Sequence, residues 1–287
     1  MESTGDTATL ANRRLQELAR LERSASERAP SRAYWWLMLW SAILISVYVA
    51  VFLATFGDST TEDVSERSGG YSATWVMMTP VIAFSALHSG ARERFRIRTR
   101  PSTLYWCLYG LAAAGFIAAG VLDIAGIAYP RWLNMLVPVV LLLTMAASPV
   151  RHLVTSSPRS PASWGDSPLS GAARLMTVLL GAAIGLLLAS SAITLAAAVS
   201  GAIAMVFLIV VLASWRSSYG LPRAGYQWHL IHWVSFGTSS AIVFVCVLLT
   251  TFTTWFGTGH NAAAGALVFL VMGVAAFLPR RSDQRER

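Results

Sequence analysis

The stretch "YWWLMLWSAILISVYVAVFLATF", at positions 34–56, contains no charged residue. An α-helix rises about 1.5 Å per residue, so a run of this length crosses the roughly 30 Å hydrocarbon core of a bilayer. Seven more apolar segments follow, separated by short polar stretches. We therefore predict eight membrane helices, at 34–56, 72–89, 103–125, 132–149, 172–190, 192–215, 228–255 and 262–279.

The composition agrees with this pattern. The 287 residues are 55% hydrophobic and only 13% charged, whereas soluble domains average about 25% charged residues. We predict an all-α polytopic membrane helix bundle: an N-terminal segment at 1–33, a transmembrane domain at 34–279 and a basic tail at 280–287. The fifth and sixth helices are separated only by "SSAIT" at 190–194, which predicts a tight hairpin.

The basic residues set the orientation. All of them are arginine, and placing the N-terminus inside puts every arginine except Arg67 and Arg131 on the cytoplasmic side. Cytoplasmic loops of membrane proteins carry such an excess, so we expect four hairpins with both termini cytoplasmic. The charge is spread over loops, which argues against a nucleic-acid groove. The Arg, Ala, Gly and Val bias is typical of high-GC bacterial genomes and favours the bacterial inner membrane.

The N-terminal segment has its own pattern. Ala11, Leu15, Leu18 and Leu21 recur at roughly helical spacing among charged residues. This spacing indicates a cytoplasmic amphipathic helix that lies on the membrane or on a partner protein. The alternative is a solvated tail.

A similar motif begins three of the helices: "PSRAYWW" at 30–36, "PSTLYWC" at 101–107 and "PRAGYQW" at 222–228. Proline suits the first turn of a helix, and Tyr and Trp are enriched at headgroup depth. We interpret the motif as a helix start with an aromatic belt. A duplication that relates the first two copies stays open.

Four histidines lie at the predicted cytoplasmic helix ends: His88, His152, His229 and His232. Imidazoles at one depth on different helices could converge on a metal ion or ligate a haem. Two alternatives are a pH-responsive cluster and interfacial residues with local hydrogen bonds. A fifth histidine, His260, stands in a predicted outer loop.

The loop "RERFRIRTR" places an arginine at every second position: Arg92, Arg94, Arg96, Arg98 and Arg100. This period would put them on one face of an extended strand, while a helix would spread them around its axis. In either case the loop is expected to attract anionic lipid headgroups or an acidic partner. The alternative is a topology determinant without further function.

Three other features are candidates for function. Asp123 at the outer end of the third helix could couple transport, or it could pair with Arg131 as an interfacial ion pair. Pro80 and Pro138, in two short helices, could open backbone to a cavity, or they could be tolerated kinks. The "GAAIG" stretch at 181–185 is a G-x-x-x-G pattern that predicts close helix packing, within the bundle or in a homo-oligomer.

No complete set of nucleophile, base or paired carboxylates appears, and the lack of lysine excludes a Schiff base. The leading hypothesis is a non-catalytic transport component or accessory, without a cofactor, that acts with lipid or a partner protein. One alternative is a sensor, regulator or scaffold that uses the N-terminal helix. The other is a metal- or haem-dependent oxidoreductase that uses the four histidines.

Overall fold

The computed structural model describes residues 17, 32–56, 68–95, 103–125, 127, 129–130, 132–155, 168–214 and 217–278. These residues form helices joined by turns, and no strand occurs among them, so the predicted all-α class is confirmed. The helices are α2 (Arg32–Phe56), α4 (Ser68–Arg94), α5 (Thr103–Ile124), α6 (Leu133–Thr155), α7 (Gly171–Ser190), α8 (Thr194–Ala213), α9 (Leu221–Gln227), α10 (Leu230–Phe252) and α11 (Thr258–Ala276).

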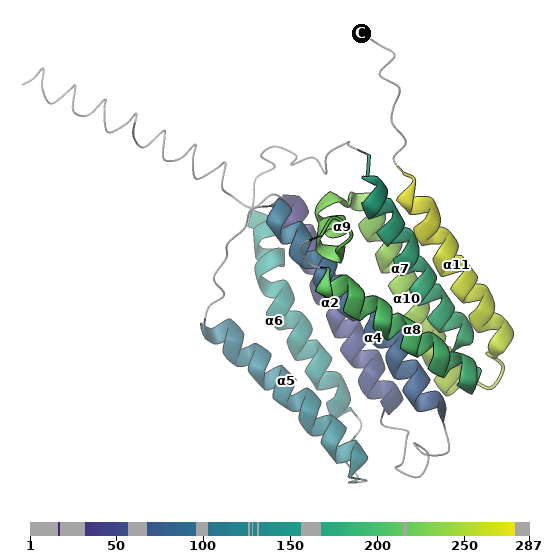
Figure 1. The fold of residues 1–287 in the computed structure, drawn as a ribbon. Coiled ribbons are helices and arrows are strands. Elements are labelled where there is room, and N and C mark those ends of the chain that lie inside the picture. The colour runs from purple at the N-terminus through teal and green to yellow at the C-terminus, as the bar shows by residue number, and fades with distance from the viewer. Residues whose placement is uncertain are drawn as a thin grey trace, which may run out of the picture.

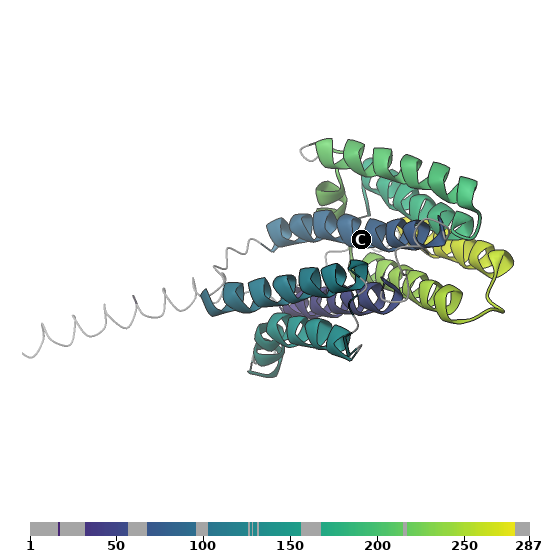
Figure 2. The ribbon, with the colours of Figure 1, turned by 90° about the horizontal axis from the view of Figure 1, so that it is seen from below.

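The long helices run up and down the bundle, and the short helix α9 marks one end of it (Figure 1). At this end, called the α9 end below, α2, α7 and α10 begin and α4, α6 and α11 finish. The view from below places α6 and α8 on opposite edges, with α2 and α4 between them (Figure 2). α2 begins and α11 finishes at the same end. The chain from α2 to α11, both included, therefore crosses the bundle an even number of times.

Seven of the described helices are long and apolar enough to cross a membrane, so the chain is a multi-pass membrane protein. The remaining helix, α4, corresponds to the second predicted span, at 72–89. It is not apolar enough to be counted with the seven, although with 27 residues it is longer than the other described helices. It contacts α2, α7, α8, α9 and α10, and its Ala83, Ala86 and Leu87 are fully buried. A helix enclosed by other helices tolerates polar residues that a lipid-facing helix does not.

The predicted G-x-x-x-G pattern packs inside the bundle. Gly181 and Gly185 of α7 face Met272 and Gly265 of α11, and α7 and α11 contact each other along most of their length. Close backbone approach supplies much of the packing between helices in lipid. This glycine face is therefore covered by α11 and is not available to a second copy of the chain.

The two proline-bearing helices are neither short nor broken, contrary to the prediction. α4 and α6 have 27 and 23 residues and continue through Pro80 and Pro138. Neighbouring helices in a membrane bundle can satisfy the backbone groups that proline frees. Both prolines are buried, and a cavity beside either one stays a prediction.

The aromatic-belt interpretation of the repeated motif is wrong for three of its side chains. Tyr34 and Trp35 are buried, and Trp35 stacks on His152 with ring centroids 4.1 Å apart. Trp228 is 0% exposed. Trp106, in the second copy, is 59% exposed and fits a belt position. The motif thus starts helices, and tertiary packing buries Tyr34, Trp35 and Trp228, whereas Trp36 and Tyr226 are 55% and 40% exposed.

Candidate functional site at the α9 end

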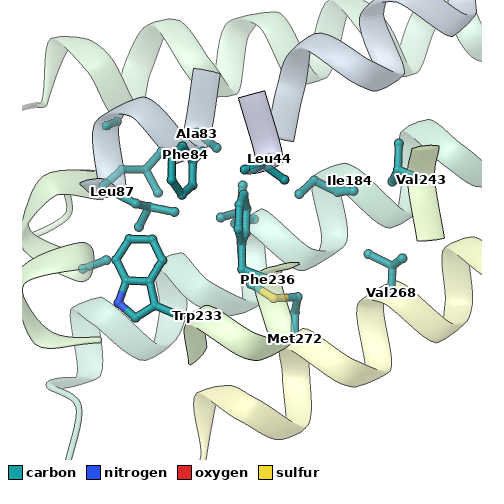
Figure 3. Packing of buried hydrophobic residues seen from close by; sticks show 14 of the residues in the cluster. Leu44, Ala83, Phe84, Leu87, Ile184, Trp233, Phe236, Val243, Val268 and Met272 are labelled. Atoms are coloured by element: carbon teal, nitrogen blue, oxygen red, sulfur yellow. The ribbon is translucent and has the colours of Figure 1, made fainter. Parts of the chain in front are cut away.

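A connected group of aromatic and imidazole rings fills the bundle near the α9 end. Phe84 of α4 lies 6.0 Å from Trp233 and 6.2 Å from Phe236 of α10 between ring centroids, and Figure 3 shows the three side by side. Trp228 extends the group, at 5.1 Å from Trp233 and 6.0 Å from His232. We call this set the ring cluster; its members are Phe84, His88, Trp228, His229, His232, Trp233 and Phe236.

The local sequence "WHLIHW", at 228–233, supplies four of the seven members of the cluster. Trp228 and His229 form the two-residue link between α9 and α10, and His229 has the extended backbone of an N-cap residue. His232 then stands three residues later, on the neighbouring position of the helix face. Its Nδ1 accepts a hydrogen bond from the backbone N–H of His229 at 3.1 Å. This bond leaves Nε2 as the nitrogen that carries the proton in the neutral ring.

Hydrogen bonds from α4, from α7 and from the residue before α7 hold α9 and the link in place. The guanidinium of Arg94, at the end of α4, donates from Nη1 to the carbonyl oxygens of Tyr226 at 3.3 Å and Trp228 at 3.0 Å. The indole Nε1 of Trp228 donates to Thr177 Oγ1 of α7 at 3.0 Å. The backbone N–H of Ser170, before α7, donates to Gln227 at 2.9 Å. These bonds join α9 and the link to α4 and to the start of α7.

Glycines allow α9 to lie directly on α4. A Cβ on Gly90 would fall 1.7 Å from the carbonyl oxygen of Pro222, and one on Gly225 would fall 2.0 Å from that of Leu87. No side chain fits between the two backbones at these points. The short helix is therefore fixed against α4 by sequence positions that only glycine can occupy.

Several buried nitrogens of this region have no hydrogen-bond partner. They are His88 Nε2, Arg174 Nε, His232 Nε2 and Trp233 Nε1. Indole and guanidinium N–H groups are donors only, and the Nε2 of the His232 tautomer is also a donor. These N–H groups can therefore donate hydrogen bonds to an acceptor such as water, a carbonyl or an anion.

No protein-family model, curated protein or solved structure matches the chain.

The geometry places the four predicted histidines in two regions. His229 and His232 lie 5.7 Å apart between ring centroids, and His88 joins the ring cluster by stacking on Phe84 at 5.6 Å. His152 instead stacks on Trp35, on the α2 and α6 side. Among the described residues, no three His, Cys, Asp or Glu side chains are grouped so that they could hold a metal ion. The predicted metal set thus gains no support from this arrangement.

Two of the five arginines in the predicted row can be placed in the structure. Arg92 and Arg94 belong to the last turn of α4, so the extended-strand interpretation is wrong for these two. Arg92 is exposed, while Arg94 turns toward the carbonyls of α9 and the link. Arg96, Arg98 and Arg100 lie outside the described residues. The N-terminal amphipathic helix and the side chains of Asp123 and Arg131 also lie outside them.

The sequence reasoning missed Thr177, Arg94 as a partner of α9, and α9 itself. A signal for α9 was present in "GLPRAGYQ", where Pro222 stands two residues after Gly220, because proline suits the first turn of a helix. Nothing in the sequence paired Thr177 with Trp228, which are far apart in the chain.

Proposed function

We propose that the chain is a non-catalytic membrane transport component or accessory that acts with anionic lipid headgroups at its α9 end. The observation that carries this proposal is where the described arginines lie. All six are at helix ends or in α9, on the α9 end of the bundle: Arg32, Arg92, Arg94, Arg151, Arg174 and Arg223. From residue 32 onward, the described side chains include one carboxylate, Glu93, at the same end.

This distribution supports lipid binding on physical grounds. Basic residues near an anionic membrane surface each contribute about 1 kcal/mol of attraction. Arg92, Arg151 and Arg223 are exposed, so their guanidinium groups are open to headgroup phosphates. The excess of arginine also supports a cytoplasmic location for the α9 end, because positive charge is retained on that side.

The transport part of the proposal is supported by polar atoms inside the bundle. Ser46 Oγ, Ser239 Oγ and Asn261 Oδ1 are buried without a hydrogen-bond partner. Polar groups within a membrane domain are costly, and they commonly line the path of an ion or a small solute.

The test compares lipid retention in nanodiscs made from phosphatidylcholine with and without phosphatidylglycerol. We expect the wild-type protein to retain phosphatidylglycerol preferentially in native mass spectrometry. The triple variant Arg92→Gln, Arg151→Gln, Arg223→Gln should lose roughly a hundredfold in affinity, from three contributions of about 1 kcal/mol each. High salt should weaken the preference of the wild-type protein, because it screens surface charges.

Glu93→Gln is the matched control, since it changes one exposed charge of opposite sign at the same end. It should leave retention unchanged or raise it. Equal retention of both lipids by the wild-type protein would overturn the proposal, as would an unchanged triple variant. Orientation is checked separately with reporter fusions after residue 278, which should be active only in the cytoplasm.

A further inference from the structure

One face of α10 carries polar residues at intervals from one end of the helix to the other. With 3.6 residues per turn, Ser239 is about 20° from His232 around the helix axis, and Thr250 returns to about the same angle as His232. Cys246 lies between Ser239 and Thr250 along the helix, and it is about 40° from His232 around the axis. His232 and Ser239 are both 0% exposed, and Cys246 is 5% exposed. These residues form a single stripe, called the α10 polar stripe below.

The α10 polar stripe faces α11 at both of its ends. Near the α9 end, the imidazole of His232 lies against the carbonyl groups of Ala275 and Leu278, although Nε2 meets no partner with hydrogen-bond geometry. At the other end, Asn261 of α11 donates from Nδ2 to Thr250 Oγ1 at 3.5 Å. Ser239 lies between these points along the helix and within about 20° of the same face, so we infer that it is directed toward α11 as well.

The stripe is long enough to matter for a membrane. From His232 to Thr250 the helix rises about 27 Å, which is close to the roughly 30 Å thickness of the hydrocarbon core. The polar groups are therefore distributed from one end of the membrane domain to the other, between two packed helices.

Three atoms along this interface lack a partner: His232 Nε2, Ser239 Oγ and Asn261 Oδ1. The neighbouring Ser240 is different, because its hydroxyl donates to the carbonyl oxygen of Phe236 at 2.9 Å. The three atoms are respectively a donor, a donor and acceptor, and an acceptor. Water satisfies such mixed requirements, and buried polar groups without protein partners commonly bind it.

We propose that the α10 polar stripe and Asn261 form a hydrated path that carries protons between the two ends of the bundle. A proton that enters at one end is passed along waters and polar groups, each of which receives one proton and releases one, so no group is consumed. This inference deepens the transport part of the proposed function by naming the species carried. It does not depend on lipid binding at the α9 end.

Two apolar residues close the path in this structure. Phe236 and Val243 lie about 40° and 20° from His232, on the other side of it from Ser239 and Cys246, and so form the adjoining edge of the same face. Figure 3 shows them in the interior with Val268 and Met272 of α11. Along the helix axis, Phe236 stands between His232 and Ser239, and Val243 stands between Ser239 and Cys246. Protons can therefore pass only when these side chains move or when water enters between them.

The first test uses the two native cysteines. Cys246 is beyond Val243 on the Thr250 side, whereas Cys107 is exposed on α5. In Cys107→Ser protein in nanodiscs, a small charged methanethiosulfonate should modify Cys246, because the reagent needs water to reach a thiolate. The control is Val245→Cys in protein that also carries Cys107→Ser and Cys246→Ser. Position 245 is 52% exposed on the outside of α10, where lipid should exclude the reagent.

Modification at position 246 without modification at position 245 supports the path. No modification at 246, or equal modification at both positions, overturns it. Neither result depends on lipid retention, so failure here is distinguishable from failure of the headgroup proposal.

The second test measures proton flux into liposomes that contain a pH-sensitive dye, under a potassium diffusion potential. Phe236→Ala should raise the flux above that of the wild-type protein by opening the closed segment. In the Phe236→Ala background, Ser239→Ala should lower the flux by about tenfold, the effect of losing one hydrogen-bonding step. Ser240→Ala is the matched control and should change it less than about twofold. Flux no higher than in empty liposomes for both wild-type and Phe236→Ala protein overturns the proposal, as does an equal loss from the two serine variants.

Discussion

Gly185 of α7 and Gly265 of α11 meet backbone to backbone. A Cβ on Gly265 would lie 2.3 Å from the carbonyl oxygen of Gly185, and a Cβ on Gly185 would lie 2.5 Å from that of Gly265. Real Cβ atoms essentially never approach another atom within 3.0 Å. A single methyl group at either position must therefore push the two helices apart.

Gly265→Ala should destabilise the protein by about 1–3 kcal/mol, the usual cost of adding a group to a packed interior. The thermal unfolding midpoint in mild detergent measures the effect. Gly201→Ala on α8 is the matched control, because a Cβ there meets nothing within 4 Å. An unfolding midpoint for Gly265→Ala equal to that of the control would contradict the tight α7 and α11 contact.

Arg94→Met should loosen α9, because it removes both hydrogen bonds to the carbonyls of Tyr226 and Trp228. We expect the free energy of unfolding to fall by about 1–2 kcal/mol, because the guanidinium that donates both bonds is charged but partly exposed. Hydrogen exchange should rise at the backbone amides of Leu221–Gln227 in particular. Arg92→Met, two residues earlier and exposed, should leave the exchange there unchanged.

Thr177→Val should leave the indole N–H of Trp228 buried and unpaired, at a cost of about 1–3 kcal/mol. Trp228→Phe removes the donor as well as part of the ring. In the double variant the two losses should be less than additive, because the shared hydrogen bond can be lost only once. Strict additivity of the unfolding free energies would show that the bond contributes nothing.

Asn134→Leu tests a polar tie at the end opposite to α9. The Asn134 side chain accepts from the Tyr129 hydroxyl at 2.8 Å and donates to the carbonyl of Leu53 at 3.4 Å, which links α6 to α2. We expect a loss of about 1–3 kcal/mol for Asn134→Leu and about 0.5–1.5 kcal/mol for Tyr129→Phe, which removes only one of the bonds. A larger effect of the tyrosine variant would contradict this order.

The sequence predicted seven of the spans well because each is a long apolar run between polar segments. The predicted hairpin at 190–194 is confirmed, with residues 191–193 between α7 and α8. The helix α9 was missed because "LPRAGYQ" is short and has no apolar periodicity, and its contact with α4 depends on Gly90 and Gly225 from distant parts of the chain.

The candidate site was predictable only in part, for a similar reason. The spacing of His229 and His232 predicted that they are neighbours, since it follows from helix geometry alone. Tertiary packing decides which helices meet these two histidines. The sequence therefore could not show that His88 joins them through Phe84, or that His152 lies apart from them. The G-x-x-x-G pattern likewise predicted close packing without naming α11 as the partner.

The pairing of α7 with α11 also bears on how the protein is made. A ribosome completes α7 well before α11, and α8, α9 and α10 emerge in between. During synthesis the glycine face of α7 therefore enters the membrane before its partner exists. Assembly of this half of the bundle must wait for the last described helix, and a nascent chain that stops before Thr258 is left with an open face for the cell's membrane proteases to recognise.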